Sequence, residues 1–294
     1  MSSPDKILFP EQGVSKRDLA GYLVEMANHI LPDLSRRPLS LVRCPEGYED
    51  GCFFQKHGAS GFPEEIKRVS IREKSGKKAD YLYIDDVTGL AAAAQMGVID
   101  LHIWGAHIDD IEKPDRMVFD LDPAEDVSFA QVKQAAQDVR NTLSAAGLES
   151  FPLLTGGKGI HVVVPLERQQ SWDTVKQFAS GLARMLSSLE PDRFIAKSAK
   201  ADRRGRIFID WLRNERGATA VAPYSPRARK GAPVAVPVNW GELSRIDSAN
   251  KYKMDNVRAR MKRLKNNPWN GYNEARQSIN ADALESIEWS AKRN

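Results

Sequence analysis

The stretch that most constrains the fold is a short strand, residues 116–123, that carries two aspartates. Its valine, phenylalanine and leucine are strand formers, and a strand sends residues i and i+2 to the same face, so Asp120 and Asp122 point the same way. Two like charges on one face repel, so a cation is expected between them. Carboxylate oxygens suit Mg²⁺ or Mn²⁺, which makes the pair a candidate metal site. The alternative is that Asp122 and Pro123 open a turn and Asp120 is a lone charge at a sheet edge.

Length and composition favour a globular protein with a packed core, because 294 residues with 41% hydrophobic content suffice for one large domain or two modest ones. No apolar run approaches the roughly 20 residues of a membrane helix, and the first residues do not resemble a signal peptide. We therefore interpret the protein as cytoplasmic, with no membrane partner. Cys44 and Cys52 are too few for a zinc site and, in a reducing compartment, are predicted to be free thiols rather than a disulfide.

Positive charge is concentrated in two segments. Residues 197–230 hold ten basic and three acidic residues, and residues 251–265 hold seven basic residues and one acidic residue, although the whole chain carries only +4. This asymmetry favours a cationic surface for nucleic acid or a nucleotide. The alternative is that these residues form ordinary solvated faces.

Hydrophobic periodicity predicts alternating helices and strands. Helices are expected over residues 15–31, 90–96, 128–146, 172–189 and 252–264, and strands over residues 38–42, 69–72, 81–84, 98–104, 117–122, 206–212 and 218–222. Ser15 and Asp18 form a capping box for the first helix, and Pro32 is expected to end it.

A glycine-rich stretch, residues 153–165, is the second candidate site. Its glycines let the backbone approach an anion closely, while Thr155, Lys158 and His161 supply a hydroxyl, an ammonium and an imidazole. The stretch is therefore a candidate triphosphate cradle, although it lacks the spacing of a Walker A loop. The alternative is a glycine-rich turn between two strands.

Four further residues qualify as candidates from their positions on strands. Asp210, near the end of the strand over residues 206–212, is a third carboxylate, and His102 lies on the strand over residues 98–104. Adjacent Phe53 and Phe54 must diverge in an extended segment, so one is expected in the core and the other exposed, where it could stack on a base. The alternatives are a structural histidine and a pair of core phenylalanines.

Together, Asp120-x-Asp122, the stretch from Thr155 to His161 and Asp210 resemble the three motifs of the archaeo-eukaryotic primase superfamily. Over nearly the whole chain the sequence is similar to the polymerase domain of bacterial ATP-dependent DNA ligase D, which repairs breaks by non-homologous end joining. Matching stretches include residues 6–10, 53–57 and 216–225.

The resemblance implies a two-metal nucleotidyltransferase. It assigns Asp120, Asp122 and Asp210 to two Mn²⁺ or Mg²⁺ ions, with no zinc. It assigns the nucleotide to His102, Thr155, Lys158, His161 and Arg227, and DNA to Lys6, Lys16, Phe53 and Phe54. Lys6 and Lys16 match residues that bind a 5′-phosphate on the downstream strand. The family usually has serine where Thr155 stands, and the hydroxyl is retained.

The fold implied is α/β (α+β), with an N-terminal αβ subdomain packed on an RRM-like catalytic sheet. We expect one primase-polymerase domain over residues 1–294, with a core over about 10–270 and a C-terminal tail over 271–294.

The expected function is addition of ribo- or deoxyribonucleotides to primer 3′-ends at gaps and double-strand breaks. The expected partners are gapped or broken duplex DNA with a 5′-phosphate, NTP or dNTP, and Ku and ligase or nuclease domains, in association with the nucleoid. Two alternatives are a metal-dependent nuclease, which has no use for a triphosphate cradle, and a non-catalytic nucleic-acid binding module.

Overall fold

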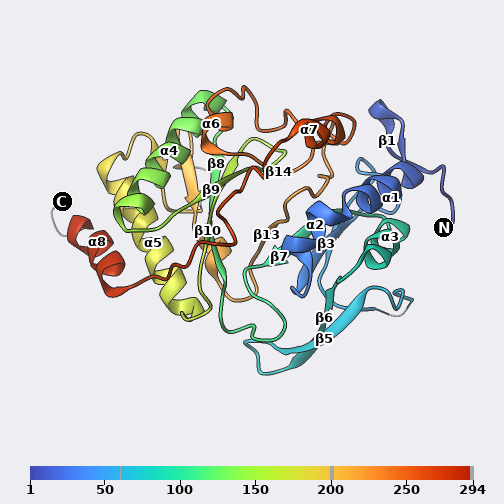
Figure 1. Cartoon of the computed structure of the whole chain (residues 1–294), viewed down its shortest axis with the longest axis horizontal. Coiled ribbons are helices and arrows are strands. Elements are labelled where there is room, and N and C mark those ends of the chain that lie inside the picture. The colour runs from blue at the N-terminus through green and yellow to red at the C-terminus, as the bar shows by residue number, and fades with distance from the viewer. Residues whose placement is uncertain (60, 199–201, 292–294) are drawn as a thin grey trace. The chain divides into compact units, whose positions relative to one another are not determined.

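A computed structural model describes residues 1–59, 61–198 and 202–291, and the chain divides into two compact units (Figure 1). Unit 1 comprises Met1–Asp109, Thr219–Val236 and Tyr252–Arg263, and unit 2 comprises Asp110–Ala218, Pro237–Lys251 and Leu264–Asn294. Lys200, one of the basic residues counted above, lies outside the described residues. The expectation that the chain acts as one catalytic domain stays a prediction.

Unit 2 contains a βαββαβ arrangement. Its elements are β8 (Arg116–Pro123), α4 (Phe129–Ala145), β9 (Phe151–Leu154), β10 (Ile160–Pro165), α5 (Trp172–Leu189) and β12 (Ile207–Asp210). The sheet order is β12-β8-β10-β9, with every neighbouring pair antiparallel, and a short β11 (Phe194–Ile195) runs parallel to β12. β14 (Val236–Pro237), where the chain passes between units, comes after β9 in the sheet. The first and third strands are thus central, which confirms the expected RRM-like sheet.

The core of unit 2 lies between this sheet and its helices. Phe119 and Leu121 on β8 are fully buried, and α4 and α5 lie on the same side of the sheet (Figure 1). Because residues alternate along a strand, Asp120 and Asp122 face the other side. The sheet therefore has a helix-covered apolar face and a second face that carries the acidic residues.

The predicted C-terminal tail includes a helix that packs within unit 2. α8 (Ala281–Ala291) lies against α5, where Gly181 leaves room for Ile287. A Cβ at Gly181 would lie 2.5 Å from Cδ1 of Ile287, so a larger residue would require the Ile287 side chain to shift. Unit 2 also contains η3 (Leu212–Asn214) and the short α6 (Trp240–Leu243).

In its described residues, unit 1 contains a four-stranded antiparallel sheet, two hairpins and four helices. The sheet order is β13 (Thr219–Val221), β7 (Val98–Trp104), β3 (Leu39–Arg43) and β4 (Phe53–Gln55). The hairpins are β1 (Ile7–Phe9) with β2 (Val14–Ser15) and β5 (Lys67–Arg72) with β6 (Lys78–Tyr83), and η1 (Pro10–Gln12) links the first pair. The helices are α1 (Lys16–Glu25), α2 (Ala27–Leu34), α3 (Val87–Gln95) and α7 (Val257–Arg263). In this unit the segment over residues 219–236 contacts the central strand β7. The Leu101 N–H on β7 donates a 2.8 Å hydrogen bond to Ser225 Oγ.

The first helix departs from its predicted bounds. The Ser15–Asp18 capping box is present, but the helix breaks at Met26, and α2 continues past Pro32 to Leu34. The prediction that Pro32 ends the helix is wrong. Proline removes one bond to the Asn28 carbonyl, and both residues lie on the exposed side of α2, where that carbonyl can be solvated.

The prediction of free thiols is also wrong. Cys44 and Cys52 form a disulfide, with an S–S distance of 2.02 Å. Between them Gly47 and Gly51 take positive φ values of 118° and 99°, which turns the chain back and brings the two Cα atoms to 4.4 Å. The count of cysteines does not reveal that local turn.

Within the described residues, none of the helices combines the length and apolar character that crossing a membrane requires.

Candidate active site

Three neighbouring strands of unit 2 bring the acidic candidates together. Asp120 lies near the end of β8, directly opposite Asp210 on β12 and directly opposite His161 on β10. Directly opposed residues share a face of the sheet, with Cβ atoms about 5 Å apart. The register therefore places two carboxylates and an imidazole side by side, and it brings together Asp120 and Asp210, which the family resemblance assigns to one site.

Arg213 is the cation beside the two carboxylates. It comes from η3, three residues after Asp210, and its guanidinium lies 3.2 Å from Oδ2 of Asp120 and 3.2 Å from Oδ2 of Asp210. His161 Nε2 lies 3.5 Å from the other oxygen of Asp120. A guanidinium thus compensates the repulsion that opposed carboxylates create.

Asp210 shows the electrostatic cost of the arrangement. Burial raises the pKa of its carboxyl, Arg213 opposes that rise, and the nearby charge of Asp120 adds to it. A raised pKa means that the protein disfavours the ionised form, so a stronger cation at this place would stabilise the carboxylate.

Asp122 lies on the same face of β8 but pairs elsewhere. Its carboxylate is about half exposed and lies 2.6 Å from Nη1 of Arg203, whose guanidinium stacks 4.3 Å from the centre of the Phe208 ring. Phe208 is the residue opposite Asp122 on β12. Arginines therefore neutralise all three of the predicted carboxylates.

The donor set fits a hard divalent cation in its chemistry and only partly in its arrangement. Asp120, Asp122 and Asp210 supply carboxylate oxygens on one face, which are the ligands that Mg²⁺ and Mn²⁺ prefer. In the described part of the chain, however, no three acidic, histidine or cysteine side chains converge closely enough to hold a metal. Asp122 would have to leave Arg203 to join the other two.

The glycine-rich stretch forms a tight turn between β9 and β10. Thr155 Oγ1 donates a 2.9 Å hydrogen bond to the Gly159 carbonyl and accepts one from the Gly157 N–H at 3.3 Å. A Cβ at Gly159 would lie 2.4 Å from the Leu121 carbonyl oxygen, so only glycine lets the turn approach β8 this closely. The backbone therefore forms a glycine-rich turn between two strands, which was the alternative expectation. The buried hydroxyl of Thr155 stabilises this turn.

The basic candidates of the turn point in different directions. His161 is 4% exposed and lies beside Asp120. The Lys158 side chain is 60% exposed, and its ammonium lies 3.6 Å from a carboxylate oxygen of Glu125, which is itself almost fully exposed. Such an exposed pair holds Lys158 weakly, so its charge is available to a ligand.

His102 and Arg227, both in unit 1, share one carboxylate, that of Asp100, which the sequence patterns did not indicate. Arg227 Nε donates a 2.8 Å hydrogen bond to Oδ2 of Asp100, and His102 Nε2 lies 3.5 Å from the same oxygen. The backbone N–H of Ala228 donates to Oδ1 of Asp100. Although burial raises the pKa of Asp100, His102 and Arg227 hold it below its ordinary value, so the group is a carboxylate that positions both basic side chains.

Phe53 and Phe54 lie on the edge strand β4, and both are exposed, by 46% and 65%. The expectation that one of them enters the core is wrong, because β4 is too short and too peripheral to bury either face. Arg43 lies 5.3 Å from the centre of the Phe53 ring, and Phe54 meets His102 edge-on with ring centres 5.8 Å apart. Two exposed aromatic rings beside basic side chains offer stacking surfaces for bases.

Lys6 and Lys16 are neighbours at the start of α1. The Lys16 N–H donates a 2.8 Å hydrogen bond to the Lys6 carbonyl. Lys6 Nζ pairs with Glu46 at 2.8 Å, whereas Lys16 is buried and its Nζ donates to the Ser2 carbonyl at 3.3 Å. Burial lowers the pKa of Lys16, and the nearby charge of Lys6 adds to that effect.

Comparison with known proteins places these features in one family. A family model described as the LigD primase-polymerase domain matches residues 15–269. The Multifunctional non-homologous end joining protein LigD of Pseudomonas aeruginosa is 40% identical over 282 residues, which cover 96% of this chain, and its Mycolicibacterium smegmatis counterpart is 35% identical over 246 residues. The chain spans about a third of those relatives' length, 34% and 32%.

A solved structure shares the fold. The polymerase domain of Mycobacterium tuberculosis Ligase D in complex with DNA superposes with a TM-score of 0.83 and 31% sequence identity, over 90% of this chain and 94% of that one. The α/β (α+β) fold that the family resemblance implied is thereby confirmed.

Proposed function

Because the chain belongs to the LigD primase-polymerase domain family, we propose that it adds nucleotides to primer 3′-ends at DNA gaps and breaks in non-homologous end joining. The observation that carries the proposal is the cluster of Asp120, Asp210 and His161 on one face of an RRM-like sheet, beside the glycine-rich turn. An acidic cluster next to a basic turn suits a nucleotide triphosphate whose charge is neutralised during transfer. A metal-dependent nuclease would need the carboxylates but not the turn.

In this proposal Asp120, Asp122 and Asp210 hold two divalent ions, Mn²⁺ or Mg²⁺. Such ions, when bound, activate the primer 3′-hydroxyl and neutralise charge on the phosphates. Arg203 and Arg213 are the cations that these side chains contact in the present structure, and they would have to give up these contacts if the carboxylates held the ions. The proposal includes no zinc, since the two cysteines are too few for a zinc-ligand set and are joined in a disulfide.

The residues proposed to contact the nucleotide lie in each unit separately. In unit 2, Lys158 supplies a loosely held ammonium, His161 an imidazole beside Asp120, and Thr155 the hydroxyl that shapes the turn. In unit 1, His102 and Arg227 are oriented by Asp100. A guanidinium held by a buried carboxylate is pre-organised, so less entropy is lost when it binds a phosphate.

DNA is the proposed macromolecular partner. Phe53 and Phe54 would stack on bases, and Lys6 and Lys16 would bind a 5′-phosphate at the far side of a gap. The relative of known structure was solved in complex with DNA, and the longer relatives are named as end-joining proteins. Action at the nucleoid together with Ku, ligase and nuclease components belongs to the same proposal.

Primer extension on a gapped duplex tests the proposal. Wild-type protein should extend the primer with Mn²⁺ or Mg²⁺ and a nucleotide triphosphate, and Asp120→Ala, Asp122→Ala and Asp210→Ala should each abolish extension while duplex binding is retained. The reason is that the carboxylates serve the chemistry and the basic residues serve affinity. Shortening of the primer in place of extension would identify a nuclease, and extension at the wild-type rate by one variant would remove that residue from the site.

A further inference from the structure

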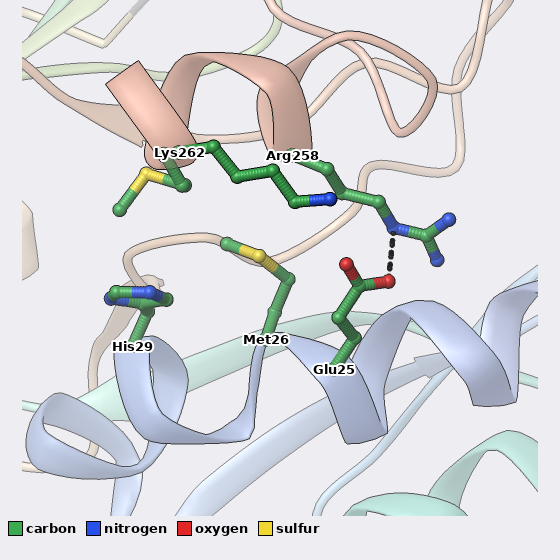
Figure 2. A pocket seen from close by; sticks show the side chains of 6 residues that line it. Glu25, Met26, His29, Arg258 and Lys262 are labelled. Carbon is green, nitrogen blue, oxygen red and sulfur yellow. Dashed lines mark ion pairs between the residues drawn. The ribbon is translucent and has the colours of Figure 1, made fainter. Parts of the chain in front are cut away.

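A small pocket in unit 1 lies outside every residue assigned above. Glu25 and Met26 at the end of α1, His29 on α2, and Arg258, Met261 and Lys262 on α7 line it (Figure 2). Its volume is about 190 Å³. A water in the liquid occupies about 30 Å³ and drug-sized sites begin near 300 Å³, so the pocket accommodates a single ring or one side chain.

The walls of the pocket are soft and apolar. Met26 is 2% exposed, and Met261 lies across from it on α7. The ring of His29 is held by Tyr224, with ring centres 5.6 Å apart. Thioethers adapt to flat rings and interact favourably with them, and an imidazole offers a face for stacking.

One edge of the pocket is cationic. Figure 2 shows Arg258 and Lys262 extending from the same side of α7, with Glu25 reaching up to Arg258 from α1. The Arg258–Glu25 ion pair is 2.9 Å long, and the guanidinium also lies 5.6 Å from the centre of the Tyr22 ring, so Arg258 is fixed. Within the described residues Lys262 makes no ion pair and remains exposed at the rim.

The placement of these two charges is unfavourable without a ligand. Like charges four residues apart on a helix destabilise it by a few tenths of a kcal/mol, and Glu25 compensates one of them. The surrounding segment, residues 251–265, holds seven basic residues and one acidic residue. A positive field around an apolar ring-sized pocket favours a ligand that combines a flat ring with an anion.

We propose that this pocket binds one nucleotide of single-stranded DNA, with the base between Met26, Met261 and His29 and the adjacent phosphate on Lys262. Partial burial lowers the pKa of His29, so its ring is neutral near pH 7 and can stack without repelling the arginine. A polyanion is favoured over an acidic peptide because exposed Arg263, on α7 but outside the pocket, adds positive charge next to Lys262. The site is separate from the proposed reaction, and its test does not depend on catalysis.

Methyl NMR of protein labelled at the methionine methyl groups reports on the pocket directly. Titration with a short oligo(dT) should shift the Met26 and Met261 signals, because a stacked base changes the local ring current, and should leave buried Met117 unmoved. An abasic oligonucleotide of equal length keeps every phosphate and should shift neither pocket signal. Unmoved pocket methyls with oligo(dT), or equal shifts with the abasic strand, would overturn the proposal.

Fluorescence anisotropy with the same oligo(dT) tests the phosphate contact. Lys262→Ala should weaken binding about fivefold, whereas the matched loss of charge in Arg263→Ala, on the same helix but outside the pocket, should weaken it less than about twofold. Met261→Trp, which fills the pocket, should weaken binding as Lys262→Ala does, and the volume-conserving Met261→Leu should not. Equal losses of oligo(dT) affinity in Lys262→Ala and Arg263→Ala would show that only the general positive charge of the helix matters, and would refute the site. Pocket methyls that respond to an acidic peptide but not to oligo(dT) would assign the pocket to a protein partner and refute it as well.

Discussion

Replacing Arg213 with alanine should destabilise the protein when no divalent ion is present. The guanidinium lies 3.2 Å from an oxygen of Asp120 and 3.2 Å from an oxygen of Asp210, two carboxylates that the sheet register places opposite one another. Two unit charges 4 Å apart interact by about 4 kcal/mol at an effective dielectric constant of 20. The Arg213 side chain is 39% exposed, and exposed ion pairs contribute only about 0.2–1 kcal/mol each, so the two pairs together give an expected net loss of about 0.4–2 kcal/mol.

Thermal unfolding in EDTA measures this loss. At about 2–4 °C per kcal/mol for a chain of this size class, Arg213→Ala should lower Tm by about 1–8 °C. Saturating Mn²⁺ should restore most of the difference, because a metal ion supplies the positive charge that the variant lacks and stabilises the folded state by mass action. Ion binding should therefore raise the Tm of the variant more than that of the wild type.

Arg193 provides a matched control. It also bridges two carboxylates, Asp138 and Glu190, and its side chain is 38% exposed, but the register of β8, β10 and β12 does not involve it. Arg193→Ala should lose stability in EDTA and regain none of that loss with Mn²⁺. If Arg213→Ala unfolds at the wild-type temperature in EDTA, or if Mn²⁺ stabilises both variants equally, the assignment of a cation position between Asp120 and Asp210 is wrong.

Three further predictions concern residues around the proposed site. Lys158→Ala should weaken nucleotide triphosphate binding by about 1.5–3 kcal/mol in titration calorimetry and change the free energy of unfolding by less than about 0.5 kcal/mol, since its side chain is exposed; unchanged affinity would favour a purely structural turn. In fluorescence anisotropy, a gapped duplex with a 5′-phosphate should bind more tightly than the same duplex with a 5′-hydroxyl. This difference in affinity should be smaller in Lys6→Ala and larger in Glu46→Gln, because Glu46 competes for the Lys6 ammonium. Identical affinities at low salt would refute phosphate recognition. Because its pKa is lowered, the Asp100 carboxylate stabilises the fold at pH values above the ordinary carboxyl pKa, and this stabilisation is lost as pH falls through the lowered pKa. In urea unfolding, Asp100→Asn should therefore be less stable than wild type near neutral pH, and the two stabilities should converge in acid. A stability difference that does not change with pH would contradict this.

The sequence predicted several elements of unit 2 because their periodicities are strong, whereas α8, in a tail of weak periodicity, was not predicted. The strand with Asp120 and Asp122 and the helix over residues 172–189 were located from apolar patterning alone, and α5 has the predicted bounds. The predicted helix boundaries were less accurate in segments dominated by charged residues, where apolar periodicity is weak. An example is α7, which begins at Val257 rather than at residue 252. Propensity also failed at Pro32, where solvent exposure decided the outcome.

The partners of the candidate residues could not be predicted in the same way. Arg213, Arg203 and Asp100 contact the predicted site residues, yet nothing in one sequence specifies which residues of two strands or loops become neighbours. Two signals were present: Arg213 follows Asp210 by three residues, and Asp100 shares a strand face with His102. Each becomes informative only once register is known. The disulfide between Cys44 and Cys52 was not predicted either, because it depends on the local turn that brings the two residues together.

The direct opposition of Asp120 to Asp210 and to His161 also limits how such a site can change during evolution. A strand shifted by one residue turns all of its side chains to the opposite face, so one inserted or deleted residue within β8, β10 or β12 would separate the three groups. Insertions in the connections outside these strands leave the register untouched. Variation in this site should therefore occur by substitution within strands, whereas changes in length should be confined to the loops that join them.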